Sequence, residues 1–170
     1  MTDISSSTSS TTGPASTTGP APAGLHRPVV FFAVPDCARA IDFYVRTFGA
    51  EPVSRFETAD GIVMHAELRL GGVVFQLGEP SPDYGLLASP ADGNAFTMTF
   101  WTPEVDEVFQ KAVAAGATVM SALSDAFSGD RMGVVRDPFG VRWCIGRHDR
   151  DVPAEEIEAA ARAWVESQSN

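Results

Sequence analysis

The sequence predicts an α+β protein built from two similar modules, each with the element order strand, helix, strand, strand, strand. Two stretches carry this prediction, GIVMHAELRLGGVVFQLG at residues 61–78 and GDRMGVVRDPFGVRWCIG at residues 129–146. Each reads as two strands joined by a glycine-containing turn. A helical pattern that ends at a glycine precedes each pair, and a short apolar run precedes each helix. Two copies indicate a paired module rather than a solenoid.

The first module is predicted to begin with a wholly apolar strand at residues 29–34, which is typical of a central strand. Asp36 is the predicted N-cap of a helix over residues 37–48, and Gly49 is its predicted end. Cys37 falls in the first turn of this helix. A helix N-terminus lowers the pKa of a thiol, so Cys37 is either a reactive cysteine or a small structural residue, and the second interpretation is preferred.

A strand at residues 51–58 and a hairpin complete this module. Apolar residues alternate with polar ones over residues 64–70, and Gly71-Gly72 suits a tight turn. The period of two predicts that His65, Glu67 and Gln76 share one face of the hairpin. We expect this face to line any pocket that the protein has.

The second module repeats this order after a loop rich in Pro, Gly, Ser and Asp. Its first strand is predicted at residues 96–101, and Thr102 is the predicted N-cap of a helix with Pro103 at its first position. The following strands are predicted at residues 118–123, 131–136 and 142–146, with a type I turn at residues 137–140 between the last two.

The predicted organisation has five parts. They are a disordered Ser/Thr/Pro-rich tail (1–25), the first module (26–78), the inter-module loop (79–94), the second module (95–148) and a C-terminal helix (149–170). The last helix carries an apolar stripe at helical spacing. Because both modules are complete without it, the stripe requires either the sheet of this chain or a second subunit.

The composition limits the partners and the location. The 170 residues carry a formal charge of -10 without a basic stripe, which disfavours nucleic acid and anionic membranes as partners. No apolar run is long enough to span a bilayer. The first residues, MTDISSSTSS, have neither the basic nor the apolar segment of a secretion signal. With two cysteines, the sequence predicts a soluble cytoplasmic protein with reduced thiols.

The repeat, together with MHAELRLGG and GDRMGVVRDPFGVRW, resembles the vicinal oxygen chelate superfamily. This group includes glyoxalase I, bleomycin resistance protein, fosfomycin resistance proteins and extradiol dioxygenases, and the likeness is closest to its PhnB-like branch. It covers about residues 28–151. The resemblance implies two βαβββ modules that form a curled mixed sheet around a cavity, and it implies a homodimer.

The metal-dependent members of this family take ligands from the first and last strand of each module. These places fall near Val29 and on Gln76 in the first module, and near Phe96 and on Cys144 in the second. Valine and phenylalanine do not ligate metals, and a catalytic site usually needs three protein ligands. The resemblance therefore implies that the usual metal site is lost, and no cofactor is expected.

His65 and Glu67 are the candidate catalytic residues. A carboxylate beside a histidine orients the ring and raises its pKa, which suits general acid–base chemistry. Two other interpretations stay open. The pair is a structural hydrogen bond within the sheet, or it holds a divalent ion together with Gln76 or Cys144.

The candidate ligand-binding residues include Arg131, whose guanidinium fits a substrate carboxylate unless it forms an ordinary salt bridge with Asp130 or Asp137. Apolar and aromatic residues are predicted to wall the cavity, with core packing as their alternative. The full predicted ligand-binding set is Phe31, Gln76, Phe96, Met98, Phe127, Arg131 and Cys144.

Three functions are compatible with these observations. The preferred hypothesis is a protein that binds a small, partly apolar organic molecule between its modules without the usual metal. The second is a lyase or isomerase that transfers protons through His65 and Glu67. The third is a structural or partner-binding dimer whose cavity is filled by its own side chains.

Overall fold

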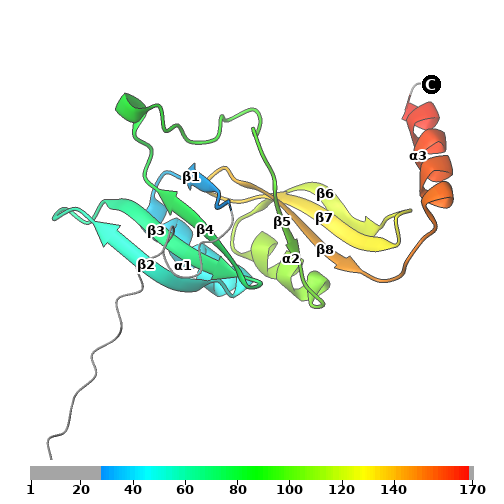
Figure 1. Cartoon of the computed structure of the whole chain (residues 1–170), viewed down its shortest axis with the longest axis horizontal. Coiled ribbons are helices and arrows are strands. Elements are labelled where there is room, and N and C mark those ends of the chain that lie inside the picture. Colours follow the sequence, from blue (N-terminus) through cyan, green and yellow to red (C-terminus); the bar gives the residue numbers. More distant parts are fainter. Residues whose placement is uncertain (1–27, 169–170) are drawn as a thin grey trace, which may run out of the picture.

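The computed structural model of the chain describes residues 28–168, so the predicted disordered tail lies outside the described residues (Figure 1). Both modules have the predicted element order. The first contains β1 (Phe31–Ala33), α1 (Cys37–Phe48), β2 (Glu51–Glu57), β3 (Val63–Leu70) and β4 (Val73–Gly78). The second contains β5 (Met98–Trp101), α2 (Val105–Ala114), β6 (Thr118–Asp125), β7 (Asp130–Arg136) and β8 (Arg142–His148).

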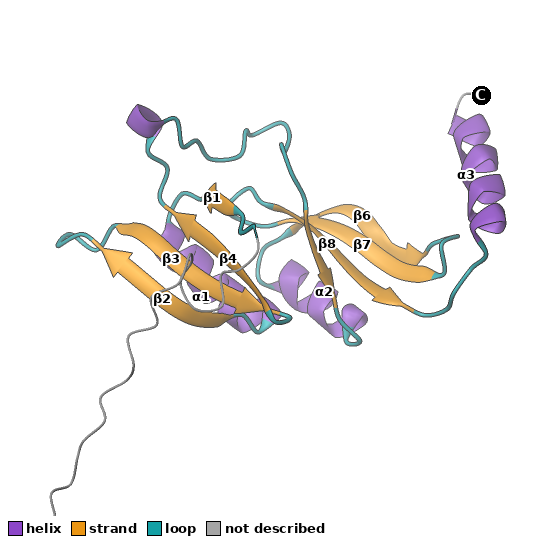
Figure 2. Ribbon diagram, in the orientation of Figure 1, coloured by secondary structure: helices purple, strands orange, loops and turns teal. Residues whose placement is uncertain are grey.

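Each module forms its own four-stranded mixed sheet. The strand orders are β1-β4-β3-β2 and β5-β8-β7-β6, so the same topology occurs twice. In each sheet the first strand pairs in parallel with the last, and the other neighbours are antiparallel. The predicted α+β fold of paired βαβββ modules is confirmed. The two sheets do not close into one barrel (Figure 2).

The helices cover one face of the sheets and join the modules. Large side chains of β3, β4 and β8 that point toward the helices are fully buried, among them Leu68, Leu77 and Trp143. The aromatic rings of α1 cross into the second module, where the Phe48 and Trp143 centroids lie 4.4 Å apart. Because the buried residues form one cluster that includes both modules, the two modules share a single hydrophobic core.

A buried carboxylate links the modules at the centre of this core. Asp137, in the turn between β7 and β8, accepts hydrogen bonds from the Tyr44 hydroxyl at 2.8 Å and the Trp143 indole nitrogen at 2.9 Å. Its other oxygen accepts the backbone N–H groups of Phe139 and Val141. Burial raises the pKa of Asp137, and these four donors oppose that shift because they favour the ionised form.

The turn predictions agree with the structure, and α1 has the predicted bounds with Asp36 at its N-cap position, but the capping contact differs. Gly71 and Gly72 both have positive φ, at 56° and 80°, as a tight hairpin requires. The side chain of Asp36 makes no capping bond; the Glu79 carboxylate, from the end of β4, accepts the Cys37 backbone N–H at 2.6 Å instead. A residue distant in sequence therefore caps α1, which no local pattern reveals.

The second helix starts later than predicted. It begins at Val105, with Glu104 as its N-cap, so Thr102 and Pro103 precede the helix. The Thr102 hydroxyl donates to the Glu104 carboxylate at 2.8 Å, and it also accepts the Glu104 backbone N–H at 3.3 Å. Thr102 thus orders the approach to α2 rather than capping it.

Two segments lie outside the shared core. The inter-module loop carries a short 3₁₀ helix (Pro82–Tyr84) and crosses from one module to the other (Figure 1). It bridges β1 at Ala88, and its carbonyl groups at Pro90 and Ala91 accept hydrogen bonds from Arg136 of β7. The last helix, α3 (Ala154–Gln168), lies apart from the sheets at the far end of module two (Figure 1). Among residues 28–168, no helix has the length and apolar character needed to cross a membrane.

Replacement of Tyr44 by phenylalanine is expected to destabilise the protein. The substitution removes one donor from the buried Asp137 carboxylate and keeps the aromatic ring, so the free energy of unfolding should fall by roughly 1.5–3 kcal/mol. Urea denaturation followed by circular dichroism measures this change. Tyr84→Phe is the matched control, because Tyr84 is 88% exposed, and its effect should stay within about 0.5 kcal/mol. Equal effects of the two substitutions would contradict the proposed role of Asp137.

Candidate functional site

The face of the first sheet that points away from α1 carries a polar cluster. On β3, Ala66 and Leu68 are buried toward the helix, so His65 and Glu67 point to the opposite face. Gln76 on β4 lies directly across from Glu67. The structure therefore brings together the three residues that the sequence places on one face, and we call this surface the module-one polar face.

Glu67 is the centre of the module-one polar face. Its Oε1 accepts the Gln76 amide at 2.8 Å, and its Oε2 accepts the Ser54 hydroxyl at 3.1 Å. The His65 Nε2 lies 3.8 Å from Oε1. The hydrogen bond from Gln76 is the main cause of a lowered Glu67 pKa, with further contributions from Ser54 and His65. Glu67 is therefore an ionised, half-buried acceptor at neutral pH.

Aromatic rings lie on both sides of His65. Phe31 on β1 has its ring centroid 5.7 Å from that of His65. Phe56 on β2 pairs with His65 from the other side, and it is 66% exposed. Sequence reasoning missed Phe56 and Ser54. Their strand was predicted, but its pairing register with β3 includes bulges that the sequence does not reveal.

The corresponding face of the second sheet carries different side chains. Cys144 on β8 lies across from Val134, where module one has Gln76 across from Glu67. Thr99 on β5 is the neighbour of Cys144, and the Trp101 ring covers Gly146 so closely that a Cβ there would lie 2.9 Å from it. Burial raises the pKa of Cys144, so its sulfur is a neutral thiol. We call this surface the module-two face.

The structure places four predicted ligand-binding residues elsewhere. Arg131 lies on the helix side, where Asp106 of α2 accepts hydrogen bonds from its Nη2 at 2.7 Å and its Nε at 3.1 Å, and Asp125 binds its Nη1 at 2.8 Å. The partners expected for its salt bridge, Asp130 and Asp137, are therefore wrong, and the two carboxylates that bind the guanidinium do not favour the predicted role of holding a substrate anion. The two carboxylates that bind Arg131 come from α2 and β6.

The aromatic and apolar wall residues of module two also differ from the prediction. Met98 neighbours Trp143 on the helix side, and Phe96 packs on Phe32 with the ring centroids 5.5 Å apart, so both contribute to the core. Phe127 is half-exposed in the loop between β6 and β7. Phe96 and Met98 stand on the apolar side of the alternation FTMT at residues 96–99, which is the side that packs against the helix.

One chain does not join the two candidate surfaces. None of the hydrogen bonds, ion pairs or ring contacts described for residues 28–168 connects the module-one polar face to Thr99, Trp101 or Cys144. The cavity that the sequence predicts between Gln76 and Cys144 is therefore not built by contacts within a single copy.

Three comparisons relate the chain to known proteins. Residues 26–145 match the Glyoxalase/Bleomycin resistance protein/Dioxygenase superfamily. An uncharacterised protein of Mycobacterium tuberculosis (strain ATCC 25618 / H37Rv) is 43% identical over 131 residues, which are 75% of this chain and 77% of that protein. The crystal structure of TioX from Micromonospora sp. ML1 is 31% identical with a TM-score of 0.57, over 75% of this chain and 99% of TioX.

PhnB-like proteins are among the structural neighbours. A Bacillus cereus PhnB protein, described as a putative 3-demethylubiquinone-9 3-methyltransferase, has a TM-score of 0.55 at 24% identity, over 71% of this chain and 98% of that chain. At this identity the likeness concerns the fold. The match over residues 26–145 establishes that the chain belongs to the Glyoxalase/Bleomycin resistance protein/Dioxygenase superfamily, and the predicted resemblance is confirmed.

The residues at the family's metal-ligand places do not fit a metal ion. The register places Phe31 beside Gln76 and Thr99 beside Cys144, and the first-strand places that the resemblance implies stay near Val29 and Phe96. Phenylalanine has no donor atom, and the Cys144 thiol is protonated. Within residues 28–168, no three His, Cys, Asp or Glu side chains cluster so as to hold a metal.

The hydrogen bond from Gln76 should control the acid titration of Glu67. Gln76→Leu removes that donor, so the pKa of Glu67 should rise toward its ordinary value of 4.5. A depressed folded-state pKa contributes stability that is present above the unfolded value and lost as pH falls through the folded value. The variant should therefore lose less stability on acidification below pH 4.5 than the wild type.

Carboxyl NMR titration and urea denaturation at several pH values measure these two effects. Gln110→Leu is the matched control, since Gln110 is an exposed residue of α2. An unchanged Glu67 titration in Gln76→Leu would contradict the assignment.

The two thiols should differ in reactivity. Cys37 is fully buried, and burial, with the nearby Glu79 charge, raises its pKa to about 12, so the interpretation as a structural residue is favoured. Cys144 is only half-buried. A thiol-specific disulfide reagent should modify Cys144 in the native protein and reach Cys37 only on unfolding, as measured by intact mass. Modification of Cys37 in folded Cys144→Ser protein would contradict this order.

Proposed function

We propose that this protein binds a small, partly apolar organic molecule on the module-one polar face, without a metal ion. The observation that carries the proposal is the Glu67 carboxylate, which Gln76 and Ser54 hold in place beside His65. Aromatic side chains from β1 and β2 lie on both sides of that histidine. Ligand sites combine apolar walls with a few fixed polar groups in this way. An acid that is hydrogen-bonded and yet still accessible is suited to bind a ligand rather than to stabilise a core.

The chemistry of this face favours a ligand with a hydrogen-bond donor or a positive charge. Ionised Glu67 only accepts hydrogen bonds, and its lowered pKa keeps it ionised. The rings of Phe31 and Phe56 offer flat apolar surfaces, and aromatic faces also attract cations. The net charge of -10 adds a long-range preference for cations over anions.

The proposal includes a homodimer in which the module-two face of a second copy closes the site. Its support is the exposure of large apolar side chains on the uncovered sheet surfaces, including Phe56 at 66% and Trp101 at 51%. Apolar surface of this kind on a folded chain marks a binding or association site. Two half-sites on one chain become two complete sites in a symmetric pair.

A lyase or isomerase activity is the second candidate. It is favoured by the 3.8 Å distance between His65 Nε2 and Glu67 Oε1, which places an acid–base pair on the same face as the proposed ligand. If a bound compound is turned over, His65→Ala should abolish turnover more than binding. Full turnover by that variant would exclude this candidate.

Ligand binding should depend on the Glu67 charge. A thermal-shift screen of planar aromatic amines and their neutral isosteres should select the amines, and calorimetry should then give their affinities. Glu67→Gln removes a charge-assisted hydrogen bond, so Kd should rise about 10- to 100-fold. Glu57→Gln on the neighbouring strand is the matched control and should bind normally. Equal affinities of Glu67→Gln and wild type, or no compound bound at all, would refute the proposal.

Elemental analysis tests the metal-free part of the proposal. The protein is dialysed with zinc, nickel, manganese and iron(II), and it should retain far less than one metal ion per chain. The physical reason is the donor set, in which Phe31 and a protonated Cys144 replace ligands. One metal ion per chain that is lost in Glu67→Ala or Cys144→Ala would show that a metal site exists on these faces.

A further inference from the structure

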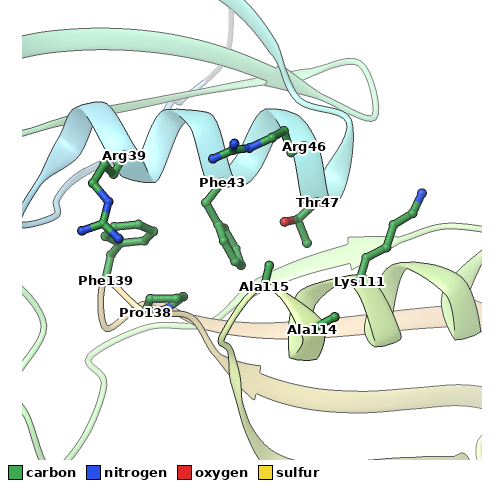
Figure 3. Close-up of a pocket in the computed structure, with 9 residues that line it drawn as sticks. All are labelled: Arg39, Phe43, Arg46, Thr47, Lys111, Ala114, Ala115, Pro138 and Phe139. Atoms are coloured by element: carbon green, nitrogen blue, oxygen red, sulfur yellow. The ribbon is translucent and has the colours of Figure 1, made fainter.

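A groove with a basic rim lies on the opposite side of the molecule from the proposed ligand site. It has a volume of about 520 Å³ and lies between α1 and α2, beside the turn that joins β7 to β8 (Figure 3). Phe43, Pro138 and Phe139 form an apolar floor. The side chains of Arg46 and Lys111 extend from the two helices around this floor (Figure 3).

The charge of this groove is opposite to that of the whole chain. Three basic residues line it, Arg39, Arg46 and Lys111, and no acidic residue does, although the chain carries a net charge of -10. The existing ion pairs of Arg39 with Asp36 and of Lys111 with Glu107 are exposed. Exposed pairs contribute little stability, so these basic side chains can turn to an acidic partner at small cost.

The C-terminal helix has a surface complementary to this groove. Ile157, Ala161 and Trp164 recur at helical spacing and form a stripe, and Trp164 is 58% exposed. Glu156 and Glu158 lie on either side of the stripe at 100° per residue. The hydrogen bonds and ion pairs described for α3 lie within the helix and its first turn, so none of them holds α3 to a sheet.

We propose that α3 of one copy docks into the α1–α2 groove of a second copy. The apolar stripe would cover the exposed Pro138, Ala114 and Ala115 above the buried rings of the floor, and Glu156 and Glu158 would face the basic rim. The 15 residues of α3 span about 22 Å, and the stretch of α1 from Arg39 to Thr47 that lines the groove spans about 12 Å, so the helix is long enough to fill it. This interface goes beyond the proposed ligand site, since it uses the helix side of the modules.

The position of α3 favours a second copy as the occupant. The linker before it is fixed, because the backbone N–H groups of Asp149 and Arg150 both donate to the Gly129 carbonyl at 3.1 Å. Gly129 precedes β7, whereas Pro138 in the groove follows it, so the seven residues of β7 separate them by roughly 20 Å. In its present position α3 points away from the groove of its own chain (Figure 1).

Directed disulfide formation between two full-length proteins tests the docking. One protein carries Ala115→Cys in the groove and the other carries Ala161→Cys in the stripe, both in a Cys144→Ser background. Docked thiols meet at a high effective concentration, so the mixed disulfide should form at least about tenfold faster than with Ala159→Cys, which lies on the opposite face of α3. Intact mass after mild oxidation measures the product.

Charge reversal then tests the electrostatic part of the interface. Arg46→Glu with Lys111→Glu in the groove protein should slow the mixed disulfide, and Glu156→Lys with Glu158→Lys in the helix protein should restore it. Glu155→Lys with Glu166→Lys makes the same charge change on the opposite face and should not restore it. Equal rates for Ala161→Cys and Ala159→Cys would overturn the proposal.

A disulfide that forms only when both cysteines are in one chain would also overturn the proposal, because the occupant would then be the chain's own helix. The cross-linking test is independent of the ligand proposal. Glu67→Gln leaves both the groove and α3 unchanged, so proteins with this substitution should form the mixed disulfide at the wild-type rate.

Discussion

The buried carboxylate of Asp137 determines how the two modules sit against each other. It accepts one donor from α1 of the first module, through Tyr44, and three from its own module, through Trp143 and the backbone N–H groups of Phe139 and Val141. Loss of one of these donors would lower the stability of the fold, because the desolvation of a buried carboxylate is compensated only when all its lone pairs are satisfied. The network therefore permits one orientation of α1 over β8.

This constraint decides which faces of the sheets remain for function. Because α1 and α2 share one core, the helix-facing side chains of both sheets are committed to packing. The same packing draws Met98 and Phe96 into the core, and the ion pairs of Arg131 tie β7 to α2. Polar chemistry is left to the opposite faces, where His65, Glu67 and Gln76 lie.

The sequence was most informative where a local pattern determines the structure. The alternation over β3 and the turn at Gly71 and Gly72 fix both the face and the register, so the pairing of Glu67 with Gln76 could be predicted. The module order was predictable for the same reason, since each element has its own local pattern. These predictions required no knowledge of how the modules pack.

Prediction failed where distant residues decide the outcome. Glu79 caps α1 and Asp106 binds Arg131 only because the fold brings them there, and no spacing in the sequence signals either contact. Phe56 was missed because bulges shift the register of β2. Phe96 and Met98 were assigned to a cavity wall, although their alternation with Thr97 and Thr99 already placed them on one apolar face. Local rules therefore predicted which residues share the module-one polar face, and not which residues surround it.

The hydrogen-bond directions on the module-one polar face restrict the ligand further. Ionised Glu67 cannot donate, so the Gln76 amide must direct its Nε2 at the carboxylate, and its carbonyl oxygen then points away from it. The Ser54 hydroxyl also uses its proton on Glu67, which leaves its lone pairs as acceptors. The face therefore presents acceptors from three side chains around an ionised carboxylate, which favours a ligand that donates hydrogen bonds over a carboxylate or a phosphate.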